Sequence, residues 1–131
     1  MRQSDAEVLD RIIRARGGFG HREHLEVAWA YIRTHPIDQA RVAMRDAIRH
    51  VAGRHGAADK YHETITQAWL HCVAVHAQRW PADGFDTFID RNPDLLDRNL
   101  LQHFYSEGLL RAHAARAGWV DPDRTPLPAL T

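Results

Sequence analysis

The stretch DKYHETITQAWLHCVAVHAQR, residues 59–79, decides the fold class because it predicts the longest helix of the chain. Ile65, Trp69 and Val73 recur along one side at helical spacing, which is typical of a helix with one buried face. Asp59 is a suitable N-cap, and Pro81 and Gly84 end the helix. Cys72 lies in the middle of this stretch beside apolar residues, and we expect a buried, unreactive thiol there.

The rest of the chain also favours helices. Gly17, Gly18 and Pro36 divide its first part into helical segments, and no segment alternates with a period of two. The sequence therefore predicts an all-α fold, an irregular bundle of about five or six helices, in a single domain covering residues 1–131. The other expected segments are helices over 4–16, 20–34 and 38–54, two short pieces within 85–98, a last helix over 99–117, and an extended, proline-containing tail over 118–131.

Composition excludes several functional classes. Hydrophobic residues make up 44% of the chain, and the 17 acidic residues balance the 17 basic ones. Zero net charge argues against nucleic acid or an anionic membrane as a partner. No apolar run approaches the roughly 20 residues that a membrane span needs, and the start of the chain has no apolar signal segment. With a single cysteine, the sequence predicts a cytoplasmic protein.

Histidines carry the strongest chemical signal, since the chain has ten of them. His21 and His24 are three residues apart, so they project from the same side of a helix. His62 lies near the start of another predicted helix. If the two helix starts meet, three imidazoles converge and leave an open position, as in catalytic zinc sites. Copper or iron would suit the same ligands. We interpret His35, His50, His55, His71 and His113 as surface residues.

Neighbouring side chains suggest how such a site would act. Lys60, the only lysine, could hold or polarise a substrate, and Glu63 could serve as a fourth ligand or a general base. Tyr31 lies one or two turns beyond His24, close enough for a proton-transfer role. Each has an alternative interpretation: a solvated side chain for Lys60 and core packing for Tyr31. For the histidines, the alternative is a capping or surface role.

Two functions of different classes follow from these residues. The first is a metal-dependent enzyme, a hydrolase or an oxidoreductase, that acts on a small molecule through a metal held by His21, His24 and His62. The second is a non-enzymatic helical module that binds a small ligand or a partner helix in an aromatic groove. Trp29, Trp69 and Tyr105 would line that groove. A homodimer fits either function, and the sequence does not decide it.

Two pairs of sequence strings belong together by resemblance. FGHREHL at 19–25 with AWAY at 28–31, and KYHETIT at 60–66 with Trp69, resemble a family of small, uncharacterised bacterial helical proteins. That family carries F-x-H-x-x-H-L-x-x-A-W-x-Y before K-Y-H-x-T-I-T. The stretches LLDRNLLQHFYSEGLL and WVDPDRTPLP also resemble its C-terminal part, so the resemblance covers about residues 19–128. It implies no activity. It groups His21, His24, Lys60, His62 and Tyr105 as residues that belong together.

Overall fold

The computed structural model describes all residues, 1–131, and confirms that the chain is all-helical. It contains seven α-helices and three short 3-10 helices, and no strand, where the sequence predicted five or six helices. The chain divides into two compact units, residues Met1–Tyr61 and His62–Thr131, which are described separately. The assignment of all 131 residues to a single domain stays a prediction.

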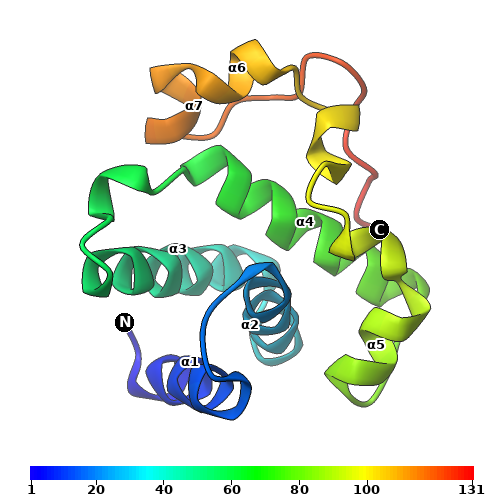
Figure 1. Ribbon diagram of the computed structural model, residues 1–131. Coiled ribbons are helices and arrows are strands. Elements are labelled where there is room, and N and C mark those ends of the chain that lie inside the picture. Colours follow the sequence, from blue (N-terminus) through cyan, green and yellow to red (C-terminus); the bar gives the residue numbers. More distant parts are fainter. The chain divides into compact units, whose positions relative to one another are not determined.

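The first unit is built from three helices, drawn from blue to cyan-green in Figure 1. Helix α2 packs on both of its neighbours, α1 and α3. Apolar residues at helical spacing form the shared core, among them Leu9 of α1, Leu25 of α2 and Met44 of α3, all fully buried. The elements of this unit are α1 (Gln3–Arg16), α2 (His21–Thr34), α3 (Ile37–Arg54) and the 3-10 helix η1 (Ala58–Lys60).

Asp5 ties α1 to the end of α2. The hydroxyl of Tyr31 donates a hydrogen bond to the backbone carbonyl of Asp5 over 2.8 Å. The Asp5 carboxylate lies 2.7 Å from Nε2 of His35, the residue that ends α2. Both Asp5 and Tyr31 are buried. These polar contacts fix how the first two helices pack, because a buried polar group is stable only with its partner in place.

The second unit forms around α4 (Glu63–Arg79), which is buried on most of its sides. Ala68, Leu70 and Val73 of this helix are fully buried. Helix α7 and the 3-10 helix η3 pack against α4. The other elements are α5 (Phe85–Arg91), η2 (Pro93–Leu96), η3 (Leu100–His103), α6 (Glu107–Arg111) and α7 (His113–Ala117), followed by residues 118–131 without helix.

Two predicted helix boundaries are wrong. Asp59 is not the cap of the long helix: residues 58–60 form the separate turn η1, and His62 caps α4 instead. The helix predicted over 99–117 is three short ones: Ser106 lies before α6 and caps it with its own hydroxyl, and the extended backbone of Ala112 separates α6 from α7. The two short pieces predicted within 85–98 are confirmed as α5 and η2.

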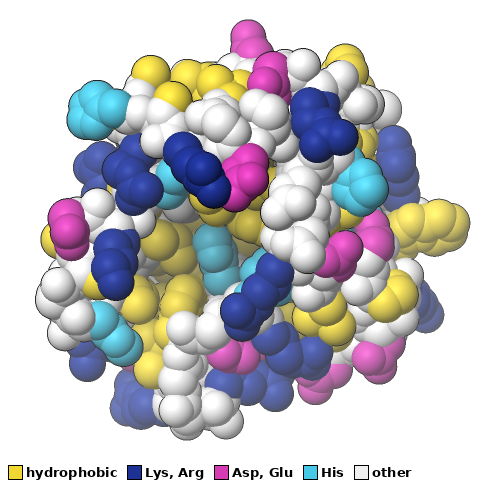
Figure 2. All heavy atoms as spheres, turned by 45° about the horizontal axis from the view of Figure 1, so that its top comes forward, with side chains coloured by type: hydrophobic (Ala, Val, Ile, Leu, Met, Phe, Trp, Pro, Cys, Tyr) yellow, Lys and Arg dark blue, Asp and Glu magenta, His cyan; other side chains and the backbone are white.

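The surface carries a mixture of side-chain types. On the face drawn in Figure 2, acidic, basic and histidine side chains are interspersed with apolar ones. This mixture agrees with the equal numbers of acidic and basic residues in the sequence. No helix combines the length and the apolar character that crossing a membrane requires.

Candidate functional site

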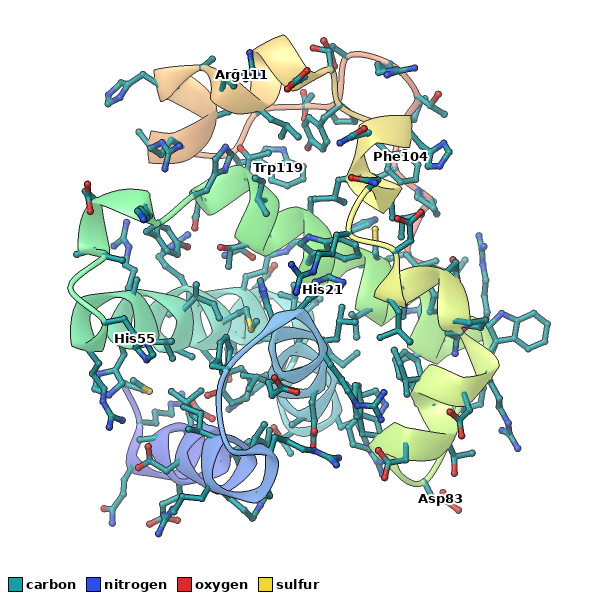
Figure 3. All side chains as sticks on the ribbon, in the orientation of Figure 1. His21, His55, Asp83, Phe104, Arg111 and Trp119 are labelled. Carbon is teal, nitrogen blue, oxygen red and sulfur yellow. The ribbon has the colours of Figure 1, made fainter.

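The first turn of α2 presents two of the three predicted histidines. Helix α2 begins at His21, which Figure 3 labels, so His21 and His24 are its first and fourth residues. Gly20 precedes the helix in an extended conformation, and its N–H donates to the Glu23 carboxylate over 2.7 Å. A carboxylate at this position satisfies a backbone donor that the helix leaves open. The turn is therefore fixed, with both imidazoles on the same side of it.

His24 has an imidazole nitrogen without a partner. Its Nε2 is buried and makes no hydrogen bond. The ring of Phe19 stacks against the His24 imidazole, with the two ring centroids 6.3 Å apart and the ring planes at 28°. Burial, with a further contribution from nearby His21, lowers the pKa of His24 to about 4. The ring is therefore neutral at pH 7, the state that binds metal ions. A buried nitrogen with no partner is uncommon and calls for an explanation.

His62 uses both of its imidazole nitrogens within the second unit. Its Nδ1 accepts the N–H of Ile65 over 3.1 Å, which caps the start of α4. Its Nε2 lies 2.6 Å from the backbone carbonyl of Leu110. Since a carbonyl only accepts, Nε2 carries the hydrogen and donates it. A metal ion at either nitrogen would displace one of these hydrogen bonds.

The predicted trio is divided between the two units. His21 and His24 belong to the first unit and His62 belongs to the second. Their convergence on one metal ion therefore stays a prediction. Neither unit by itself brings together three His, Cys, Asp or Glu side chains in a geometry that would hold a metal ion.

Lys60 and Glu63 flank His62 in sequence but differ in their surroundings. Lys60 ends η1 and is exposed. Glu63 is the first residue of α4 and is buried. A carboxylate in the first turn of a helix interacts favourably with the helix dipole, which gives Glu63 a structural role at this position. Substrate contact by Lys60, and ligation or base catalysis by Glu63, stay predictions.

Tyr31 and Tyr105 are the most deeply buried of the predicted site residues. The Tyr31 hydroxyl donates to Asp5, as described above, and the Tyr105 hydroxyl donates to the carbonyl of Val120 over 2.8 Å. Burial raises the pKa of both phenols well above the usual value. Both hydroxyls stay protonated near neutral pH and donate their hydrogen to buried carbonyls, which stabilises packing. We therefore assign neither tyrosine a part in the chemistry proposed below.

The aromatic residues predicted to line a groove are engaged otherwise. Trp69 and Tyr105 are buried in the second unit, with the Trp119 ring edge-on to Tyr105 at 6.3 Å; Figure 3 labels Trp119. Trp29, in the first unit, has the guanidinium of Arg33 4.4 Å from its ring centroid. Trp69 and Tyr105 thus offer no open aromatic surface.

Sequence reasoning missed the structural use of two histidines. His35 and His71 were interpreted as surface residues, and both make tertiary contacts: His35 with Asp5, and His71 with the carbonyl of Pro128 over 2.6 Å. No spacing signal identifies them, because their partners are 30 and 57 residues away in sequence. The prediction for Cys72 is confirmed: the thiol is free and buried, and burial, together with Asp94, raises its pKa to about 12.

Comparisons with known proteins add no relative to this picture. No protein-family model, no curated protein and no solved structure matches the chain. The functional argument therefore rests on the geometry of the chain's own residues.

Proposed function

We propose that the chain binds a divalent transition metal ion through His21 and His24 and uses it as an enzyme acting on a small molecule. One observation carries the proposal: the buried Nε2 of His24, which has no hydrogen-bond partner in the structure. A metal ion would supply the missing partner. His21, three residues earlier on the same side of α2, supplies a second imidazole.

The chemistry of the pair supports a metal such as zinc, copper or iron. Neutral imidazole nitrogens suit all three ions, and the lowered pKa of His24 keeps its ring neutral at pH 7. Two protein ligands leave further positions on the metal for water and substrate. A bound metal supplies Lewis acidity and makes bound water more acidic, and a redox-active one can exchange electrons. Hydrolysis and oxidation both stay within the proposal.

The position of the pair favours a negatively charged group on the metal. The first turn of α2 carries partial positive charge, from backbone N–H groups without helical partners. This charge opposes the cation weakly but attracts an anion bound to it, such as hydroxide or a carboxylate substrate. A small molecule with a carboxylate is therefore the first class of compound to screen.

The third predicted ligand, His62, is a separate question. Its Nε2 would have to exchange the hydrogen bond to Leu110 for the metal. The proposal therefore rests on the α2 pair, and the contribution of His62 is measured on its own. Asn at position 62 preserves an acceptor for capping α4 and removes the imidazole, so His62→Asn tests ligation with the helix start retained.

Metal titration of the untagged, full-length chain tests the proposal. Zn²⁺, Cu²⁺ and Fe²⁺ are each added to protein stripped with a chelator, and bound metal is measured by calorimetry and by elemental analysis after dialysis. We expect near-stoichiometric binding of at least one ion, weakened at least tenfold by His24→Ala and by His21→Ala. His50→Ala, at an exposed histidine of α3, is the matched control and should bind as the wild type does.

Three outcomes of the titration are informative. Equal metal binding by the wild type and the His21→Ala/His24→Ala double variant contradicts the proposal. Full retention by His62→Asn shows that the α2 pair suffices, whereas loss in His62→Asn and in both α2 variants supports the complete trio. Circular dichroism of each variant must first show unchanged helix content.

The proposal also covers the cellular compartment, the class of partner and the oligomeric state. A reducing bacterial cytoplasm is supported by the single, buried, free thiol of Cys72 and by the resemblance to bacterial proteins. Balanced charge supports a small-molecule partner over a nucleic acid. Homodimer formation stays a prediction, and sedimentation of the sample used for metal titration measures it.

A further inference from the structure

Three polar residues are spaced seven apart along α4. Thr64, His71 and Gln78 lie at intervals of nearly two helical turns, so they share one side of the helix. All three contact the segment formed by residues 118–131. The contacts follow the same order in both partners, so the segment runs parallel to α4. In Figure 1 this is the red chain that ends beside α4.

All but one of the contacts are made with the main chain of the segment; the exception is the Thr131 hydroxyl, which donates to the side chain of Gln78 over 3.2 Å. Thr64 donates to the carbonyl of Gly118 over 2.7 Å and accepts the N–H of Val120 over 3.1 Å. His71 donates through Nε2 to the carbonyl of Pro128 over 2.6 Å. The side-chain amide of Gln78 donates to the carbonyl of Thr131 and accepts its N–H, each over 3.1 Å.

The two halves of the segment are held differently. Residues 118–124 are joined to α6 and η3 as well as to α4. The carboxylate of Asp123 accepts both the N–H and the hydroxyl of Ser106, over 2.7 and 2.6 Å. The N–H of Arg124 donates to the carbonyl of Phe104 over 2.9 Å. Residues 125–131 have hydrogen bonds only with His71 and Gln78.

Residues 125–131 also lack the features that would make them part of the core. None of them is buried. Pro126 and Pro128 have no N–H and fix an extended backbone, so the segment arrives at α4 already ordered. Little conformational entropy is then lost on closing, and opening breaks few hydrogen bonds.

We propose that residues 125–131 form a strap that opens from α4 about Asp123 and Arg124 and closes through His71 and Gln78, while the rest of the second unit stays folded. An open strap uncovers the α4 face that contacts its main chain. The strap is independent of the proposed metal site, since no residue of α2 takes part in it.

Amide measurements on the full-length chain test the strap. His71→Ala removes a contact to Pro128 and leaves Thr131 untouched, so an effect at Thr131 reports on the strap as a whole. In His71→Ala we expect the amide hydrogen of Thr131 to exchange at least tenfold faster, and the heteronuclear NOE of Leu127 and Ala129 to fall. Amides of α4 and of residues 119–124 should stay unchanged. His71→Gln, which retains a donor, should restore most of the protection.

A second variant and a control complete the experiment. Gln78→Ala should raise the mobility of Leu127 and Ala129. If His71→Ala does not fold, Gln78→Ala by itself tests whether the strap opens. His113→Ala, at an exposed histidine of α7, should change neither amide. Unchanged mobility in both variants would overturn the proposal. So would equal gains in exchange across 119–124 and α4, because the strap would then open only with the whole unit.

Discussion

The starts of α2 and α4 use histidine in opposite ways. At α2, Glu23 closes the first turn, and a nitrogen of His24 stays buried without a partner. At α4, His62 itself caps the helix through one nitrogen and holds the Leu110 carbonyl through the other. The histidine that caps α4 thus stabilises the second unit, whereas the histidine in the first turn of α2 leaves the first unit with an unsatisfied group. The difference shows that a histidine near a helix start acquires its role from what lies beyond the helix.

Among the changes that test this comparison, His62→Ala should lower the free energy of unfolding most. It removes the α4 cap and leaves the Leu110 carbonyl without its donor, which together should lower the free energy of unfolding by about 3 kcal/mol. Urea unfolding followed by circular dichroism measures the loss. The same change at His24 breaks no hydrogen bond through Nε2, so we expect a smaller loss that comes from the packing of its ring against Phe19. A loss at His24 as large as that at His62 would contradict this difference between the two helix starts.

The pH dependence of the unfolding free energy tests the α2 side of this comparison. The folded-state pKa of His24, about 4, lies below its ordinary value of 6.5. Between these values the unfolded chain binds a proton that the folded chain does not, so stability falls as the pH drops from about 6.5 to about 4. The loss contributed by this residue should approach about 3 kcal/mol and then level off.

A variant isolates that contribution. His24→Gln removes the titrating ring, so the difference in unfolding free energy between wild type and variant should depend on pH only within this window. His50→Gln changes an exposed histidine and should leave the pH dependence of the wild type in place. A wild-type profile that is parallel to that of His24→Gln contradicts the assignment.

Thr64→Val tests how far the start of α4 holds the end of the chain. Valine keeps the shape of threonine but leaves the Gly118 carbonyl and the Val120 N–H without their partner. We expect a loss of about 2 kcal/mol in thermal or urea unfolding. Thr34→Val is the matched control. The Thr34 hydroxyl donates only to carbonyls of its own helix, so that change should have little effect.

Glu23→Ala should have the smallest effect. It opens the capping interaction with Gly20 and should lower the unfolding free energy by about 1 kcal/mol. Glu23→Gln retains an acceptor and should recover most of the loss. If the proposed site depends on a fixed first turn, metal affinity should fall in the alanine variant and return in the glutamine variant. Calorimetric titration of both gives the answer.

Local sequence signals predicted the helices where they were strong. Glycine and proline mark the ends of the predicted segments 20–34 and 38–54, and the structure has His21–Thr34 and Ile37–Arg54. The segment 99–117 failed because its breaks have distant causes. Phe104 and Ser106 bond to Arg124 and Asp123, and no pattern within 99–117 contains that information.

The candidate site could be predicted only in part for the same reason. Spacing alone places His21 and His24 on one side of a helix. Whether a nitrogen is satisfied depends on tertiary packing, as the Leu110 carbonyl shows for His62. Within the string KYHETIT, the side chains of His62 and Thr64 anchor residues 110–120 of the same unit, a use that the string itself does not reveal.

The spacing of Thr64, His71 and Gln78 has a geometric consequence. Seven residues fall short of two full turns by about 20°, so three such positions drift by roughly 40° around α4. The bound segment therefore runs nearly parallel to the helix axis and drifts only slightly around it. Deleting one residue between His71 and Gln78 would rotate the last contact by about 100°. The register of α4 with the segment therefore constrains the length of this helix, in addition to its core.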